Sequence, residues 1–312
     1  MAIPQRARMA FTGAALGVLA LALTWYAAHE VAWLRRVDVN ILLGFLHFNR
    51  PRVDWIAETF VWFCDPSHYV VLAVLPIVIA LARRRRRLAA TAFVLLAGAN
   101  ATTEVLKPLT AGPRDHVDVP GIILTHATWP SGHTTAALSL ALALIICVPA
   151  RLRPAVSGVM ALFVVGVVYS LLALGAHYPS DIIGGFGVAV TWTLAALGAL
   201  WTYEAHRPAL ATRLSEAGAR VTVLGALLPP LATLLVAVAA GLLVVATRAH
   251  AAIGFAGSHV AFITAASVFV VLSFGCATGL SLLLRRPATP GPGSGPAPTT
   301  AHRRPPQRSL LG

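Results

Sequence analysis

Long stretches of this chain contain only apolar residues, and the polar residues gather where those stretches end. A helix needs about 20 consecutive apolar residues to cross the hydrocarbon core of a membrane. Stretches of this kind predict membrane-spanning helices near residues 9–28, 67–82, 88–106, 132–150, 155–176, 181–203, 219–247 and 258–284. The pattern therefore predicts an all-α fold, a polytopic bundle of membrane helices.

The segment from residue 37 to residue 63 has a different pattern. Its apolar residues recur at helical spacing, but charged residues interrupt them, namely Asp38, Arg50, Arg52, Asp54 and Glu58. A helix with one apolar and one charged face lies in the membrane surface rather than across the membrane. We therefore expect amphipathic helices at the interface in this segment.

The N-terminal apolar stretch follows Arg6 and Arg8 and fits two interpretations. Basic residues before an apolar run are typical of a secretory signal peptide. They are equally typical of a first membrane helix that is retained. The length of the run favours the retained helix, and Trp25 and Tyr26 at its end fit an interfacial aromatic belt.

Composition agrees with a membrane protein and excludes other classes. Apolar residues make up 57% of the 312 residues and charged residues only 11%, whereas soluble domains carry about 25% charged residues. The net charge of +13 comes from Lys and Arg. These residues lie at the ends of apolar runs, so they indicate anionic lipid headgroups as partners and not nucleic acid. The three cysteines are far apart, which predicts neither a disulfide framework nor a zinc site.

Basic residues also predict the orientation of the chain. Arg83 to Arg87 form the strongest cytoplasmic marker, and Arg151 with Arg153 mark a second cytoplasmic loop. We expect the protein to lie in the plasma membrane. Both termini then face the cytoplasm. Segments 107–131 and 177–181 face the outside. Four residues run against the rule because they fall in the first outer segment, namely Arg35, Arg36, Arg50 and Arg52.

The chain divides into four predicted parts. Residues 1–36 form an N-terminal membrane helix, and residues 37–203 form the core. Residues 204–285 hold a linker and an additional pair of membrane helices. Residues 286–312 are rich in Pro and Gly, which predicts a disordered cytoplasmic tail.

Three polar clusters remain that membrane insertion does not explain, and all fall on the predicted outer side. The first is Lys107 with Arg114. The second is WPSGH at residues 129–133, where Ser131 is a good helix N-cap, Gly132 allows a close approach to the backbone, and His133 lies in the first turn. The third is HYPSD at residues 177–181, where the Asp181 carboxylate can accept a hydrogen bond from one His177 nitrogen.

These clusters together suit phosphoryl transfer through a phosphohistidine. One imidazole attacks phosphorus, and the other protonates the leaving oxygen. The two cations and the free N–H groups of a helix N-terminus hold the phosphoryl oxygens. This chemistry requires no metal and no cofactor, and the sequence shows no metal-ligand spacing.

The three clusters resemble the motifs of the type-2 phosphatidic acid phosphatase family, also called lipid phosphate phosphatases. The family pattern is K-x6-R-P, then P-S-G-H, then S-R-x5-H-x3-D, and the resemblance covers roughly residues 37–203. It implies a six-helix phosphatase core, to which this chain adds two C-terminal membrane helices. It also implies His177 as nucleophile, Asp181 as its orienting partner and His133 as general acid. The residues implied to hold the phosphate are Lys107, Arg114, Ser131, Gly132 and Ser170.

Two positions depart from the family pattern. Asp115 stands where the family has Pro, and Leu171 follows Ser170 where the family has a phosphate-binding Arg. The site therefore lacks one of three expected cations. Arg248, in the last outer loop, is a candidate replacement.

Three functions fit these observations. The first is a phosphatase that hydrolyses a lipid phosphate or a polyprenyl (pyro)phosphate at the outer face. The second is a phosphotransferase that moves a headgroup between lipids, because a phosphodiester carries one charge fewer and needs fewer cations. The third is a catalytically weak relative that binds lipid or assists an assembly. Release of free phosphate separates the first from the others, and the sequence does not identify a protein partner.

Overall fold

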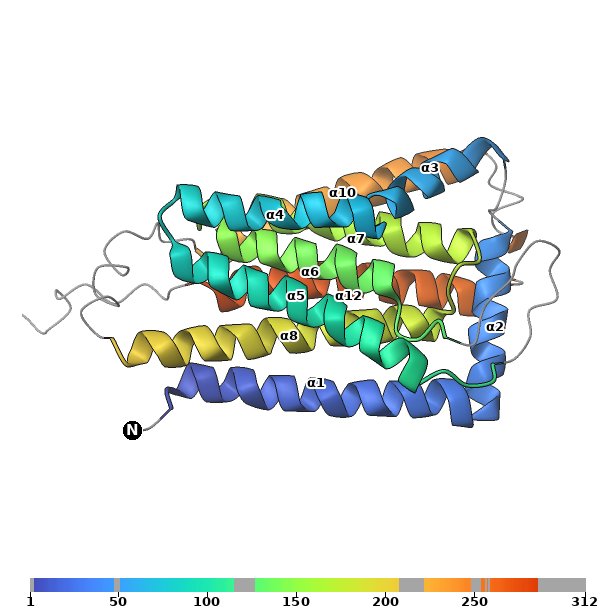
Figure 1. The fold of residues 1–312 in the computed structure, drawn as a ribbon. Helices are drawn as coiled ribbons and strands as arrows, with labels where there is room; N and C mark the ends of the chain where they lie inside the picture. Colours follow the sequence, from blue (N-terminus) through green and yellow to red (C-terminus); the bar gives the residue numbers. More distant parts are fainter. Residues whose placement is uncertain are drawn as a thin grey trace, which may run out of the picture.

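The protein is a bundle of α-helices (Figure 1). The computed structural model describes residues 3–47, 51–114, 127–207, 222–247 and most of 254–285. Its helices are α1 (Gln5–Glu30), α2 (Ala32–Leu46), α3 (Pro51–Trp62), α4 (Pro66–Ala82), α5 (Arg86–Leu109), α6 (Gly132–Cys147), α7 (Arg153–Ala173), α8 (Pro179–Ala205), α10 (Val223–Ala246) and α12 (Val260–Leu283). The predicted tail at 286–312 lies outside the described residues.

Most of the predicted spans correspond to helices long and apolar enough to cross a membrane. Within the described residues, α1, α5, α7, α8, α10 and α12 meet both conditions. Helix α4 meets them only together with α3, as a pair bent by 57° at a short break. Helix α6 has 16 residues, about 24 Å at 1.5 Å per residue, which is shorter than a typical hydrocarbon core. The chain is therefore a membrane protein, with fewer full-length spans than the eight apolar runs predict.

Helix α6 lies in the middle of the bundle, which explains why it differs from the other helices. Nearly all of its side chains are buried, including Leu138, Leu142 and Ile145. It packs against α5, α7 and α8, and more lightly against α4 and α12. A helix that is apolar on every side and surrounded by protein is a core helix, so α6 provides a rigid support for its own first turn.

Helix α2 runs across one end of the bundle, whereas the other long helices run along it (Figure 1). Its Phe45 packs in the interior against Tyr169 of α7 and Phe262 of α12. Its Asp38 is also buried. The first part of the segment predicted to be amphipathic therefore covers the ends of the other helices with both apolar and charged residues. Its second part, α3, instead packs against α7 and forms the bent pair with α4.

Helix α1 packs lengthwise on α8 through small residues. A Cβ atom on Gly17 of α1 would lie 2.3 Å from Thr191 Oγ1, and one on Gly187 of α8 would lie 2.7 Å from a Leu21 methyl carbon. Membrane helices associate closely where glycines let the backbones approach. The C-terminal helices α10 and α12 pack mainly against α7, on the other side of the bundle.

Candidate active site

The N-terminus of α6 and the N-terminus of α8 meet at the end of the bundle that α2 covers. The Ser131 backbone N–H donates to the Asp181 carbonyl oxygen at 2.9 Å, which ties the two sequence motifs together. Ser131 is the N-cap of α6, and its hydroxyl accepts from the Thr134 N–H at 3.3 Å. The close contact requires glycine on α8, because a Cβ on Gly185 would lie 2.9 Å from the Ser131 carbonyl oxygen.

The two motif histidines face each other across this junction. The ring centroids of His133 and His177 lie 6.3 Å apart. His177 Nδ1 lies 3.5 Å from Asp181 Oδ2, an ion-pair distance that is longer than a normal hydrogen bond. Asp181 is fully buried, and its Oδ2 accepts from the Tyr178 backbone N–H at 3.0 Å. The carboxylate is therefore fixed by the first turn of α8, and the His177 ring rests beside it.

Arg114, one of the predicted phosphate ligands, binds carboxylates in this structure. Its Nη1 donates to Asp181 Oδ1 at 3.2 Å, and its Nη2 donates to Asp38 Oδ2 and to the Ser180 hydroxyl, each at 2.7 Å. The guanidinium also lies over the Tyr178 ring, 4.4 Å from its centroid. Its side chain is buried, so Arg114 acts here as a counter-ion behind Asp181.

Asp38 of α2 belongs to this charged cluster, although no sequence motif indicates it. Its carboxylate accepts from the Ser180 backbone N–H at 2.9 Å, from the Ser180 hydroxyl and from Arg114. Burial raises the pKa of the Asp38 carboxyl to about 6, while the Arg114 guanidinium and the Ser180 hydrogen bonds act in the opposite direction. The only sequence signal is an acidic residue inside an amphipathic segment, and its partners lie 76 and 142 residues away.

Asp65 is a second residue that the motifs do not indicate. It precedes α4 as the N-cap residue, and its Oδ1 lies 3.1 Å from His133 Nε2. The sequence Asp65-Pro66-Ser67 is typical of a helix start, which predicts the local structure but not the contact with His133. Each histidine of the site therefore has a carboxylate beside one ring nitrogen.

Lys107 lies against the N-terminus of α6. A Cβ on Gly132 would lie 3.0 Å from Lys107 Nζ, so the ammonium group and the first turn of α6 are neighbours. The Nζ atom also contacts Glu104 Oε1 at 2.7 Å. Because this ion pair is partly exposed to solvent, the Glu104 contact restrains Lys107 only weakly.

Ser170 and Leu171 of α7 differ from Lys107 and Arg114 in their surroundings. In the described part of the chain, no hydrogen bond joins the Ser170 hydroxyl to either histidine, and its side chain is buried in α7. Leu171 is fully buried in the apolar core. Arg248 and Asp115 lie outside the described residues. The cations that the structure places at the site are therefore Lys107 and Arg114.

Metal ligands are not grouped in the part of the chain that the structure describes. There, no set of three or more His, Cys, Asp or Glu residues is arranged to hold an ion.

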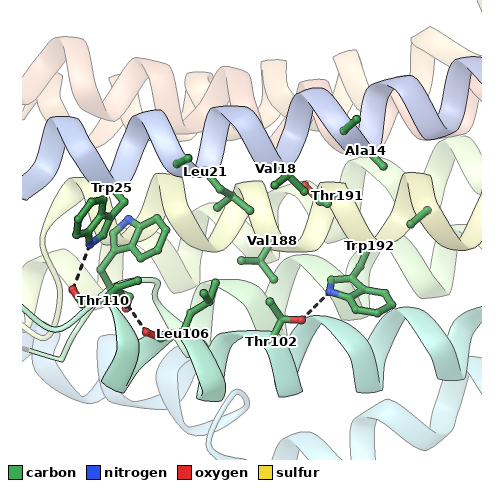
Figure 2. A pocket seen from close by; sticks show the side chains of 14 residues that line it. Ala14, Val18, Leu21, Trp25, Thr102, Leu106, Thr110, Val188, Thr191 and Trp192 are labelled. Atoms are coloured by element: carbon green, nitrogen blue, oxygen red, sulfur yellow. Dashed lines mark hydrogen bonds between the residues drawn. The ribbon is translucent and has the colours of Figure 1, made fainter.

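An apolar groove of about 630 Å³ runs beside the site, between α1, α5 and α8. Figure 2 shows Val18 of α1, Leu106 of α5 and Val188 of α8 along its walls. At one end, Trp25 Nε1 donates to the Thr110 carbonyl oxygen at 3.2 Å, and the Thr110 hydroxyl donates to the Trp129 carbonyl oxygen at 3.0 Å. Since Trp129 directly precedes Pro130 and Ser131, this end of the groove adjoins the N-terminus of α6.

Comparison with known proteins finds a family for part of the chain. Residues 87–207 match the model of the PAP2 superfamily. This range contains all but the first residue of α5 and the whole of α6, α7 and α8, and it includes His133 and His177. No curated protein and no solved structure matches the chain.

Proposed function

Residues 87–207 match the PAP2 superfamily, whose members are phosphatases, and from this premise we propose that the chain hydrolyses a lipid phosphate or a polyprenyl (pyro)phosphate through a phosphohistidine. The observation that carries the proposal is the pair of imidazoles 6.3 Å apart, each with a carboxylate beside one nitrogen. One imidazole can attack phosphorus while the other handles the proton of the leaving group.

In the first step, His177 Nε2 attacks phosphorus. The N–P bond forms while the bond from phosphorus to the lipid oxygen breaks, and His133 gives a proton to that oxygen. Asp181 stabilises the positive charge that develops on the His177 ring. In the second step, water attacks the phosphohistidine, His133 takes one of its protons, the N–P bond breaks, and phosphate leaves.

The phosphoryl oxygens need hydrogen-bond donors and positive charge. We propose that Lys107 and the free N–H groups at the start of α6, beginning at Gly132, supply them. Arg114 binds Asp181 and Asp38 in this structure, so as a phosphate ligand it remains a proposal through the resemblance alone. Ser131 contributes as the N-cap that shapes this turn, and Ser170 remains a proposed contact through the resemblance alone.

The apolar groove supports a substrate with a long hydrocarbon chain. It reaches along α1 from Ala14 to Trp25, about 16 Å at 1.5 Å per residue, which is roughly half of a hydrocarbon core. Its end at Trp25 and Thr110 adjoins the loop that leads to Ser131. We propose that a lipid chain lies in the groove while its phosphate occupies the site, which faces the outer side of the plasma membrane.

Headgroup transfer between lipids is the second candidate. Arg114 is occupied by Asp38 and Asp181, and Leu171 brings no charge. A site with few free cations is better matched to a phosphodiester, which carries one negative charge, than to a monoester.

One assay on the purified protein separates these functions. Phosphate release is measured with phosphatidic acid, phosphatidylglycerol phosphate and polyprenyl pyrophosphate, with a ³²P-labelled headgroup and unlabelled acceptor lipid in parallel. Hydrolysis predicts free phosphate and an acid-labile label on the protein. Label in the acceptor lipid without free phosphate would identify a transferase. If neither product forms, lipid binding remains as the function.

A further inference from the structure

Asp65 forms the second carboxylate–imidazole pair of the site, and the motifs do not include it. Its Oδ1 lies 3.1 Å from His133 Nε2, closer than the 3.5 Å between Asp181 and His177. The two pairs also differ in environment. Asp181 is fully buried and contacts Arg114, whereas the Asp65 side chain is 43% exposed. Asp65 therefore contacts both the His133 imidazole and solvent.

The bend between α3 and α4 places the Asp65 side chain beside His133. The two helices form an angle of 57°, and Asp65 occupies the break between them. As the N-cap residue, Asp65 has an extended backbone, but its side chain makes no capping hydrogen bond. An N-cap Asp ordinarily bonds to its own helix. Here its carboxylate turns toward the first turn of α6.

The geometry points to Asp65 as a positioning residue for His133. We propose that its carboxylate holds the Nε2–H of His133, favours the doubly protonated imidazole, and leaves Nδ1 to give and take the proton of the reaction. After the Nδ1 proton moves to the leaving oxygen, the neutral ring keeps Nε2–H on Asp65 and presents the Nδ1 lone pair to the incoming water. The inference rests on the proposed role of His133 as general acid.

The test compares leaving groups in an Asp65→Asn variant. An alkyl or lipid phosphate releases a poor leaving group that must be protonated, whereas 4-nitrophenyl phosphate releases a stable phenolate that needs little protonation. We expect kcat/KM for the lipid phosphate to fall about tenfold or more, a part of the hundred- to ten-thousandfold that a general acid contributes. With 4-nitrophenyl phosphate, kcat/KM should fall less than threefold. The comparison uses kcat/KM because this ratio reports only the steps up to the departure of the leaving group, and it leaves out the attack of water on the phosphohistidine that both substrates share.

Two further variants complete the experiment. Asp65→Glu should recover part of the lost rate, because it keeps a carboxylate at the break. Glu58→Gln removes the same charge from an exposed position of α3 and should change neither rate.

The results separate this inference from the proposed function. Suppose that the wild-type protein is active. If kcat/KM of the Asp65→Asn variant then falls equally for both substrates, or falls for neither, the positioning role alone is overturned. A wild-type protein that hydrolyses neither substrate would overturn the proposed function and this inference with it.

Discussion

At the scale of single residues, the protein holds the two histidines of the site in different ways. His177 lies beside a carboxylate that is fully buried and bound by Tyr178 N–H and Arg114. His133 lies beside a half-exposed carboxylate. A buried, fixed carboxylate suits the stabilisation of a covalent imidazole intermediate. A solvated one suits a ring that gains and loses a proton in each cycle.

Removal of the two members of the His177 pair should have unequal effects. We expect His177→Ala to abolish hydrolysis, because no other group can take the place of the nucleophile. Asp181→Asn should retain a residual activity of roughly one ten-thousandth of the wild-type rate, as when the Asp of a catalytic triad is replaced. Phosphate release per folded molecule, with folding checked by thermal melting, measures both. Full activity of His177→Ala would exclude the phosphohistidine mechanism.

Leu171 provides a second test at this scale. Leu171→Arg would place a cation where the family pattern has one. A well-placed donor is worth about 3 kcal/mol in the transition state, roughly a hundredfold in rate. We expect faster phosphate release from monoesters. Because Leu171 is fully buried, we also expect a lower melting temperature in the empty protein. An unchanged or lower rate per folded molecule would show that the site does not lack this cation.

At the scale of elements, α1 and α5 both border α8 and leave the apolar groove between them. Val18 lies in the groove and Leu19, the next residue of α1, lies outside it. Their side chains are similarly exposed, at 58% and 55%. The two positions therefore form a matched pair at the same depth of the same helix.

Val18→Trp should fill part of the groove and raise KM for a long-chain lipid phosphate several-fold. It should leave kcat/KM for 4-nitrophenyl phosphate unchanged, since that substrate has no chain. Leu19→Trp, the control, should alter neither. Kinetic measurements in detergent micelles of fixed composition would show this difference. Equal effects of the two tryptophans would mean that the groove holds only surrounding lipid.

At the scale of the whole molecule, the site and the basic run lie at opposite ends of the bundle. Figure 1 shows the N-terminus and the turn between α4 and α5 at one end, and α2 with the start of α6 at the other. Arg83–Arg87 belong to the first end. Since the rule of positive loops inside predicts this end to be cytoplasmic, the site should face outward.

Cysteine labelling of intact cells tests this orientation. In a variant without the native Cys64, Cys147 and Cys276, an impermeant maleimide should label His116→Cys but not Arg85→Cys. Permeabilised cells should label both. Labelling of Arg85→Cys alone in intact cells would reverse the predicted orientation, whatever the activity of the protein.

Local pattern predicted most of the elements but not all of their roles. The long apolar runs coincide with helices because a chain in lipid must satisfy its backbone hydrogen bonds within each segment. The apolar run at 132–150 predicted α6 but not its position inside the bundle. A helix surrounded by protein and a helix surrounded by lipid have the same apolar sequence pattern. The break before Pro66 was readable as a helix start, whereas the 57° bend there depends on how α3 packs on α7.

The sequence by itself determined the membrane class, the helical fold and the short separation of His177, just before α8, from Asp181 in its first turn. These features are local, because helix formation and the proximity of residues only four positions apart depend on neighbouring residues. The tertiary structure alone decided that Asp65 contacts His133, that Asp38 and Asp181 share Arg114, and that Leu171 is buried. Each of these depends on how segments far apart in the sequence pack together, and for Asp38 of α2 and Leu171 of α7 on how the helix is rotated about its axis. One residue turns an α-helix by about 100°, so only packing against distant segments selects which polar side chains meet.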